Sequence, residues 1–205
     1  YLVPVVLYRT VEQGLGSPDN VILGFNIGYT PLDRLRIYGQ IVLDEFVFDE
    51  WFGNNRNWWG NKAGIQLGVQ HYDVLGLEGW DAQLEWNTVR PYTYSHRDST
   101  SNYVHYNQPL AHPLGANFSE MIFRVDGVLA EKWKVNFYLL RQRFGADPEE
   151  QNYGSDILKP SDTRVRNYGV ELYQGIDTKR WLAGGVLSYN IFPGGQIETT
   201  VQYRT

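Results

Sequence analysis

The 205-residue sequence contains no cysteine, and no apolar run approaches the roughly 20 residues of a membrane-spanning helix. The absence of cysteine excludes disulfide bonds and thiolate-bound metal centres. A net charge of −5 argues against nucleic acid as a partner, because nucleic-acid-binding surfaces are basic. The first residues, Tyr1–Val6, include no basic segment of the kind that opens an export signal, so we expect such a signal to have been removed.

Aromatic residues, in contrast, are abundant. The 15 tyrosines, nine phenylalanines and seven tryptophans make up 15% of the chain, enough to supply two aromatic belts at membrane interfaces. Apolar and polar residues also alternate with a period of two. In Gly195–Arg204, for example, Ile197, Thr199, Val201 and Tyr203 share one face. This alternation is typical of a β-strand with two unlike faces.

The same alternation recurs along the chain and predicts about ten strands, joined as one domain over residues 1–205. The predicted strands are the segment that begins at residue 1 and residues 21–30, 35–44, 65–70, 80–87, 121–126, 133–140, 168–173, 181–191 and 195–204. Their polar faces include the charged residues Asp44, Glu85, Arg124, Asp126, Lys134, Glu171 and Glu198. Charges on an inward face need water, paired partners or a plug. The predicted fold is therefore all-β, an antiparallel transmembrane β-barrel with an apolar outside and a wet interior.

The gaps between predicted strands alternate between long and short. The long gaps are 46–62, 88–117 and 145–166, and the short ones are 31–33, 73–78, 130–132 and 175–178. Outer-membrane barrels have short periplasmic turns and long external loops, so this parity places the C-terminus in the periplasm. The turn Pro193–Gly195 is short for the external position that results. Trp80, Trp133 and Trp181 each follow a short gap and predict a lower aromatic belt.

The segment Asn102–Glu120 contains the most distinctive run of residues, HYNQPLAHPLGANFSE. Its two prolines and Gly115 predict a fixed, irregular path at the barrel mouth. This run resembles a segment of the Wzi-type capsule-assembly outer-membrane proteins of the Bacteroidetes, including the RemB-like gliding-motility group. The alternating strands and the final Val201–Thr205, with Arg204, are similar to the C-terminal half of that family.

The resemblance implies a bacterial outer-membrane barrel that associates with surface polysaccharide or supports adhesion and gliding, without catalysis. Members of the family are longer and have more strands, so we expect this chain to be the C-terminal part of a larger barrel. The expected partners are surface polysaccharide, outer-membrane lipid and other outer-membrane proteins. No cofactor is expected.

Two loops supply candidate ligand-binding residues, because sugar rings stack on aromatic faces and sugar hydroxyls pair with planar polar groups. The candidates are Trp51, Trp58, Trp59, Tyr103, His105, Tyr106, Asn107 and His112. The alternative for the tryptophans is packing of their loop against the barrel rim. The spacing of His105, His112 and Glu120 matches no metal motif, so we expect the histidines to hydrogen-bond the proline-rich turn. No catalytic or metal-binding residues are predicted.

Three other functions fit the same pattern. A diffusion porin would use the inward charges to set selectivity. An accessory subunit of a secretion or motility complex would use the barrel as an anchor. A soluble lipocalin-like binder would also alternate, but its interior would be apolar.

Overall fold

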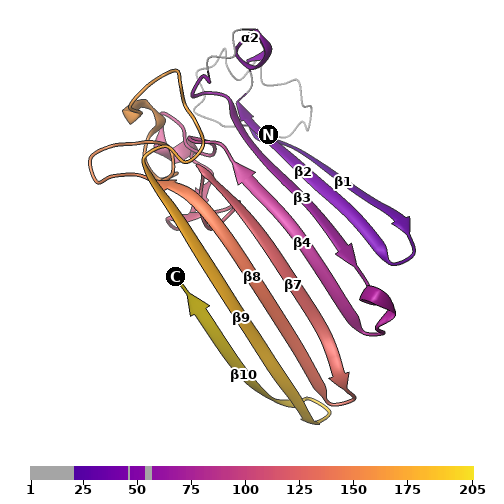
Figure 1. Cartoon of the computed structure of the whole chain (residues 1–205). Helices are drawn as coiled ribbons and strands as arrows, with labels where there is room; N and C mark the ends of the chain where they lie inside the picture. Colours follow the sequence, from indigo (N-terminus) through magenta and orange to yellow (C-terminus); the bar gives the residue numbers. More distant parts are fainter. Residues whose placement is uncertain (1–20, 46, 54–56) are drawn as a thin grey trace, which may run out of the picture.

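The computed structural model describes residues 21–45, 47–53 and 57–205. Eight strands form one antiparallel sheet in the order β1-β2-β3-β4-β7-β8-β9-β10, and β5 pairs with β6 in a small hairpin (Figure 1). The strands are β1 Leu23–Leu32, β2 Leu35–Glu45, β3 Lys62–His71, β4 Trp80–Val89, β5 Val104–His105, β6 Gln108–Pro109, β7 Phe118–Ala130, β8 Trp133–Ala146, β9 Ile176–Phe192 and β10 Gly195–Arg204. The helical segments are α2 Phe48–Phe52, η1 Val74–Gly76, η2 Ser99–Ser101 and η3 Ser161–Thr163.

The all-β, antiparallel prediction is confirmed. Each strand of the large sheet pairs with its neighbours in the sequence, and β1 and β10 are the two edges. Within the described residues the sheet does not close into a barrel. The strand predicted at the start of the chain lies outside the described residues. Among the described helices, none has the length and apolar character to cross a membrane.

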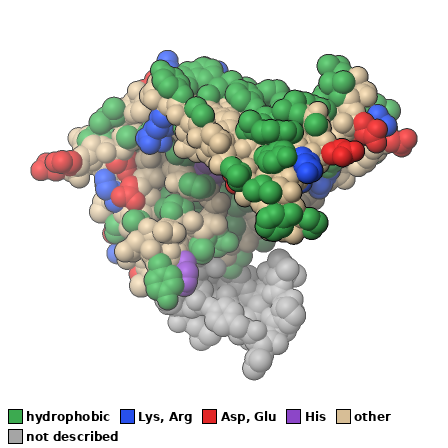
Figure 2. Space-filling model, turned by 90° about the horizontal axis from the view of Figure 1, so that it is seen from below, with side chains coloured by type: hydrophobic (Ala, Val, Ile, Leu, Met, Phe, Trp, Pro, Cys, Tyr) green, Lys and Arg blue, Asp and Glu red, His purple; other side chains and the backbone are tan. Residues whose placement is uncertain are grey.

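The register of the strands separates an apolar face from a polar face. Phe25 pairs with Ile41, and Ile41 pairs with Ile65, so the apolar residues of successive strands lie side by side. This face is exposed, with Phe25 63% and Ile27 72% accessible. Looking along the strands from the short-turn end, Figure 2 shows hydrophobic side chains along one rim of the curved sheet.

The opposite face presents amides and carboxylates in rows that cross the strands. One row runs through Asn26, Gln40, Gln66, Asn87, Glu120 and Gln142, each paired with the next. Gln40 donates to Asn26 at 2.7 Å, and Gln142 donates to Glu120 at 2.5 Å. We call these six residues the amide row. Hydrogen bonds within the row satisfy polar groups that would otherwise lose solvent when covered.

Glycines on this polar face make room for tyrosine rings from the neighbouring strand. A Cβ atom at Gly68 would lie 2.1 Å from Cζ of Tyr38, its cross-strand partner. Gly184 has the same relation to Tyr138, at 2.3 Å. The rings therefore lie flat over glycine backbone, an arrangement that stabilises glycine-containing strands by covering them.

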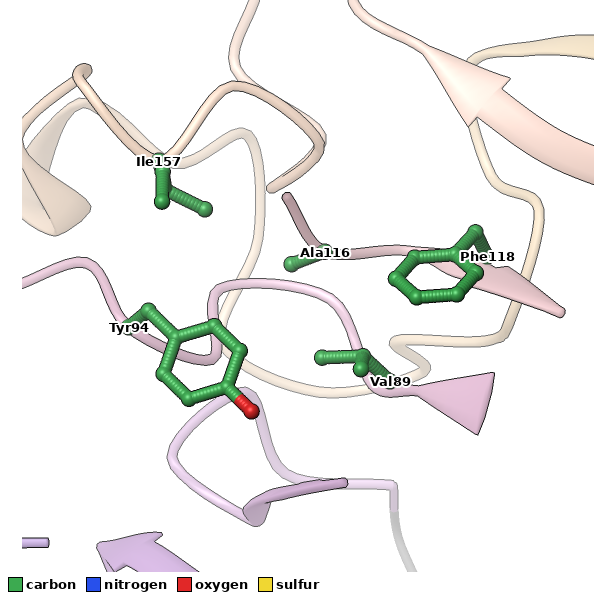
Figure 3. Close-up of a cluster of buried hydrophobic side chains, with 5 residues drawn as sticks. All are labelled: Val89, Tyr94, Ala116, Phe118 and Ile157. Atoms are coloured by element: carbon green, nitrogen blue, oxygen red, sulfur yellow. The ribbon is translucent and has the colours of Figure 1, made fainter. Parts of the chain in front are cut away.

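Three long loops gather at one end of the sheet, and the short turns lie at the other (Figure 1). The loops cover residues 46–61, 90–117 and 147–175. Loops 90–117 and 147–175 pack onto the polar face of the sheet around the buried cluster Val89, Tyr94, Ala116, Phe118 and Ile157. Figure 3 shows these side chains pointing toward one another from separate segments. The loops therefore bury both an apolar cluster and polar side chains of this face, such as Asn87 and Glu120.

The predicted strand at 168–173 is wrong. Gly169 and Tyr173 have φ angles of 69° and 67°, which interrupt an extended strand. Val170 is fully buried and its N–H donates to Asn57 O at 3.0 Å, outside any sheet. The alternation of this segment reflects packing of loop 147–175 on loop 46–61.

Without a strand at 168–173, β9 and β10 run in the opposite directions to those predicted. Pro193–Gly195 lies with the other short turns, and β10 runs back toward the long loops (Figure 1). The parity argument that placed the C-terminus at the short-turn end is therefore wrong. The predicted parity had placed this short turn among the long loops. The structure removes that anomaly, because the turn lies with the other short turns.

The predicted aromatic belt changes for the same reason. Trp133 pairs with Tyr189 near the short turns, and their ring centroids lie 4.7 Å apart. Trp181 pairs instead with Arg141, toward the loop end of β9. Trp181 is therefore not at the depth of Trp133, and the prediction of one belt that includes Trp181 is wrong.

Candidate functional site

A buried group of charged residues fastens loop 90–117 to the ends of β2 and β3. Asp44, whose side chain is 0% exposed, accepts the Tyr94 N–H at 2.8 Å. Its other oxygen lies 3.1 Å from Nε2 of His96, and Nδ1 of His96 lies 3.6 Å from Glu45. His96 thus lies between two carboxylates at the end of β2, and the His96 side chain attaches loop 90–117 to that strand.

Lys62 completes this group from the start of β3. Its ammonium group, also 0% exposed, donates to Glu45 Oε1 at 3.0 Å and to Ser95 O at 2.7 Å. The same Nζ lies 5.0 Å from the ring centroid of Trp59. Since a buried charge is tolerated only with partners, this set of contacts fixes both the strand ends and the loop.

The charged group makes the loop sensitive to pH. Burial disfavours protonation of His96, but its hydrogen bonds to Asp44 and Glu45 outweigh burial and raise its pKa above the usual value. A raised folded-state pKa stabilises the loop fully below the unfolded pKa, about 6.5, and the stabilisation is lost as pH rises through the folded value. We therefore expect limited proteolysis to cleave loop 90–117 faster at pH 8.5 than at pH 5.5.

His96→Gln should remove that pH dependence, because glutamine does not titrate. His105→Gln, at an exposed loop tip, is the matched control and should retain it. Equal pH dependence in the wild type and His96→Gln would show that another group controls the loop.

Asn117 joins loop 90–117 to loop 147–175. Its side-chain amide donates to Gly145 O at 2.9 Å and Gln174 O at 2.8 Å, and its Oδ1 accepts the Tyr173 N–H at 2.7 Å. Asn117 is fully buried, and its φ of 60° is one that asparagine tolerates better than most residues. The long loops are therefore tied to one another as well as to the sheet.

A cavity of about 330 Å³ lies between the polar face of the sheet and loop 90–117. Three members of the amide row, Gln40, Gln66 and Asn87, line it from β2, β3 and β4. Tyr94, Tyr103 and His112 line it from the loop. The amides offer both donors and acceptors, and the tyrosine rings offer flat apolar surface. We call this space the mouth cavity.

The loop residues of the mouth cavity are held in place by defined contacts. The rings of Tyr94 and Tyr103 lie 5.8 Å apart at 34°, and the Tyr103 N–H donates to Tyr94 O at 3.0 Å. Burial raises the pKa of Tyr94 to about 12, so its phenol is neutral near pH 7. These contacts hold the two rings against each other, an arrangement that favours a preorganised binding site.

His112 connects the cavity wall to the amide row. Its Nδ1 accepts the Leu114 N–H at 3.2 Å, which leaves Nε2 to donate to Glu120 at 3.1 Å. Its ring stacks on Phe118 with centroids 4.4 Å apart. The prediction that this histidine hydrogen-bonds the proline-rich turn is confirmed.

The predicted tryptophans lie apart from the mouth cavity. The guanidinium of Arg164 lies 4.1 Å from the centroid of the Trp59 ring, and the backbone N–H of Trp59 donates to Asn167 O at 2.9 Å. Trp58 contacts Trp59, with centroids 5.6 Å apart, and Trp51 on α2 lies near Arg90. The Trp59 contacts join loops 46–61 and 147–175, which favours the packing alternative for Trp59.

The remaining predicted residues form the tip of the β5–β6 hairpin. Tyr106 and Asn107 are its turn, with φ angles of 47° and 58°, and Tyr106 is 88% exposed. The His105 ring lies 4.3 Å from that of Tyr106. Of the eight predicted residues, only Tyr103 and His112 line the mouth cavity.

Sequence reasoning missed the residues of the cavity floor. Gln40, Gln66 and Asn87 lie on the polar faces of three strands and are more than 20 residues apart in the sequence, so only the register brings them together. The one feature of the sequence that could have indicated them is that each is an uncharged amide on the polar face of its predicted strand. The described residues contain no group of three or more histidine, aspartate or glutamate side chains with metal-binding geometry. Comparison of the chain with family models, curated proteins and solved structures found no match.

Proposed function

We propose that this chain forms part of the wall of an outer-membrane β-barrel and that its mouth cavity binds surface polysaccharide without chemical change. The observation that carries the proposal is the pairing of two opposite surfaces on one sheet. One face is apolar and exposed across eight strands, and the other carries the amide row and is covered by loops at one end. Lipid outside and water inside would satisfy both.

The edges of the sheet formed by the described residues support a larger barrel. Backbone groups at the edges of β1 and β10 would be costly in lipid, so membrane barrels close. β1 runs from the loop end to the short-turn end and β10 runs the other way. If the barrel closes with antiparallel neighbours throughout, the number of further strands between β10 and β1 is therefore even or zero.

The composition of the mouth cavity supports a carbohydrate ligand. Amide side chains pair with hydroxyl groups as donor and acceptor, and tyrosine rings stack on the apolar faces of sugars. Loop 90–117 and the strands of the cavity floor enclose about 330 Å³, within the range of ligand sites. None of the described residues that line the cavity is a lysine or an arginine, which favours hydroxyl-rich glycans over phosphates.

The test is binding of purified surface polysaccharide from the producing cells to Gln66→Leu protein. Removing one amide should weaken binding about 10-fold, the equivalent of about 1.4 kcal/mol for one lost polar pair. Biolayer interferometry with the full chain in detergent measures the change. Trp58→Ala, tested alongside, asks whether loop 46–61 contributes a separate site.

Gln202→Leu is the matched control. Gln202 lies on the same face, on β10, and bonds Tyr138 at 2.8 Å outside the mouth cavity. Its replacement should leave glycan binding unchanged. Unchanged binding in Gln66→Leu, or an equal loss in Gln202→Leu, would refute the cavity as the glycan site.

A further inference from the structure

The apolar face of the sheet carries charged side chains in one small area. Traced through the strand pairings, its positions on β1, β2, β3, β4, β7 and β10 hold no Arg, Lys, Asp or Glu. Glu45 is set apart, because a register shift at the end of β2 places it beside buried Lys62. On β8 and β9 the charged residues of this face are Arg141, Arg143, Asp177 and Lys179.

These four residues are cross-strand neighbours. Arg143 pairs with Lys179, and Arg141 pairs with Trp181. The Arg143 guanidinium donates twice to Asp177, both at 2.9 Å, and lies 4.0 Å from the Tyr173 ring centroid. Arg143 is therefore fixed in orientation, and three positive charges face one negative charge.

Arg141 and Lys179 are exposed, and within the described residues neither has a carboxylate within 4.0 Å. The guanidinium of Arg141 lies 5.7 Å from the ring centroid of Trp181, which is 45% exposed. The next pair toward the short turns, Leu139 and Ala183, is apolar. The basic residues thus stand at the border between the apolar face and the loops.

We propose that Arg141, Arg143 and Lys179 bind the phosphate groups of lipid headgroups in the leaflet on the loop side. The inference rests on the proposed barrel, because it places this border at the height of the headgroups. Guanidinium and ammonium groups are the preferred partners of phosphate, and tryptophan favours the same interface. Charge complementarity selects an anionic lipid, since the patch carries a net positive charge.

The test uses the full chain in vesicles of neutral lipid, with and without lipid A that carries two phosphates. Co-purified lipid A is quantified by mass spectrometry after gentle extraction. The double variant Arg141→Gln/Lys179→Gln should retain about 30-fold less, because each basic residue near an anionic surface contributes about fivefold. Dephosphorylated lipid A should show no preference for the wild type.

Arg180→Gln is the matched control, since Arg180 lies between Lys179 and Trp181 but faces the opposite side, against Phe144. It should retain lipid A as the wild type does. Equal retention by the double variant, or equal retention of the dephosphorylated lipid, would overturn the phosphate site alone. Failure of the wild type to float with the vesicles would overturn the proposed barrel and this site with it.

Discussion

Asn117→Ala should destabilise the protein by about 3 kcal/mol, since it removes three hydrogen bonds that the buried Asn117 side chain makes to backbone groups. Those groups are the carbonyls of Gly145 and Gln174 and the N–H of Tyr173. Each belongs to loop 147–175 or to the end of β8 that leads into it. We expect the loss to appear as a lower midpoint in guanidinium unfolding of the detergent-solubilised chain, followed by tryptophan fluorescence.

Asn107→Ala separates the lost hydrogen bonds from backbone strain. Asn107 has nearly the same φ, 58° against 60°, but is exposed at the tip of the β5–β6 hairpin. Alanine at either position meets the same left-handed penalty, about 1 kcal/mol. If the two variants were equally destabilised, strain alone would explain Asn117, and the proposed link between the loops would be wrong.

Lys62→Met should have an effect of similar size, about 3 kcal/mol, because it removes one partner from a buried charged group. Methionine retains the shape of the lysine stem but leaves Glu45 and Ser95 O without the ammonium donor. The same unfolding measurement reports the cost. Proteolysis of loop 90–117 should also become faster, since Lys62 and His96 attach it to the same strand ends.

The double variant Lys62→Met/Glu45→Gln tests this cause directly. A neutral glutamine no longer needs a cation, so part of the stability should return relative to Lys62→Met alone. Lys159→Met is the control. The Lys159 side chain is 29% exposed and its Nζ lies 3.7 Å from Asp147, which also accepts three backbone N–H groups, so its loss should cost less than about 1 kcal/mol. Equal costs for Lys62→Met and Lys159→Met would contradict a special role for the buried group.

Alternation in the sequence predicted the sheet well because each strand has one wet and one apolar face. It failed at residues 168–173, where a loop also alternates, since period two does not reveal the left-handed angles of Gly169 and Tyr173. It also ended β8 too early and began β9 too late. Arg143 and Thr178 continue the pairing although the polar residues there no longer alternate with apolar ones.

The candidate site was harder to predict than the fold. Loop residues such as Tyr103 and His112 stand out by type, and both do line the mouth cavity. The floor depends on the register of β2, β3 and β4, which a single sequence does not specify for residues more than 20 apart, such as Gln40, Gln66 and Asn87. Tyr94 was not singled out because its role follows from a left-handed backbone, with φ of 73°, that turns it toward the sheet.

The tyrosines that lie over glycines give the polar face a constraint on its evolution. A side chain at Gly68 would collide with the Tyr38 ring, and loss of that ring would uncover the Gly68 backbone. Either change alone is unfavourable, whereas both together restore a filled surface. Positions 38 and 68, and likewise 138 and 184, should therefore change as pairs through descent, and their joint variation would record the register of this sheet in any set of related sequences.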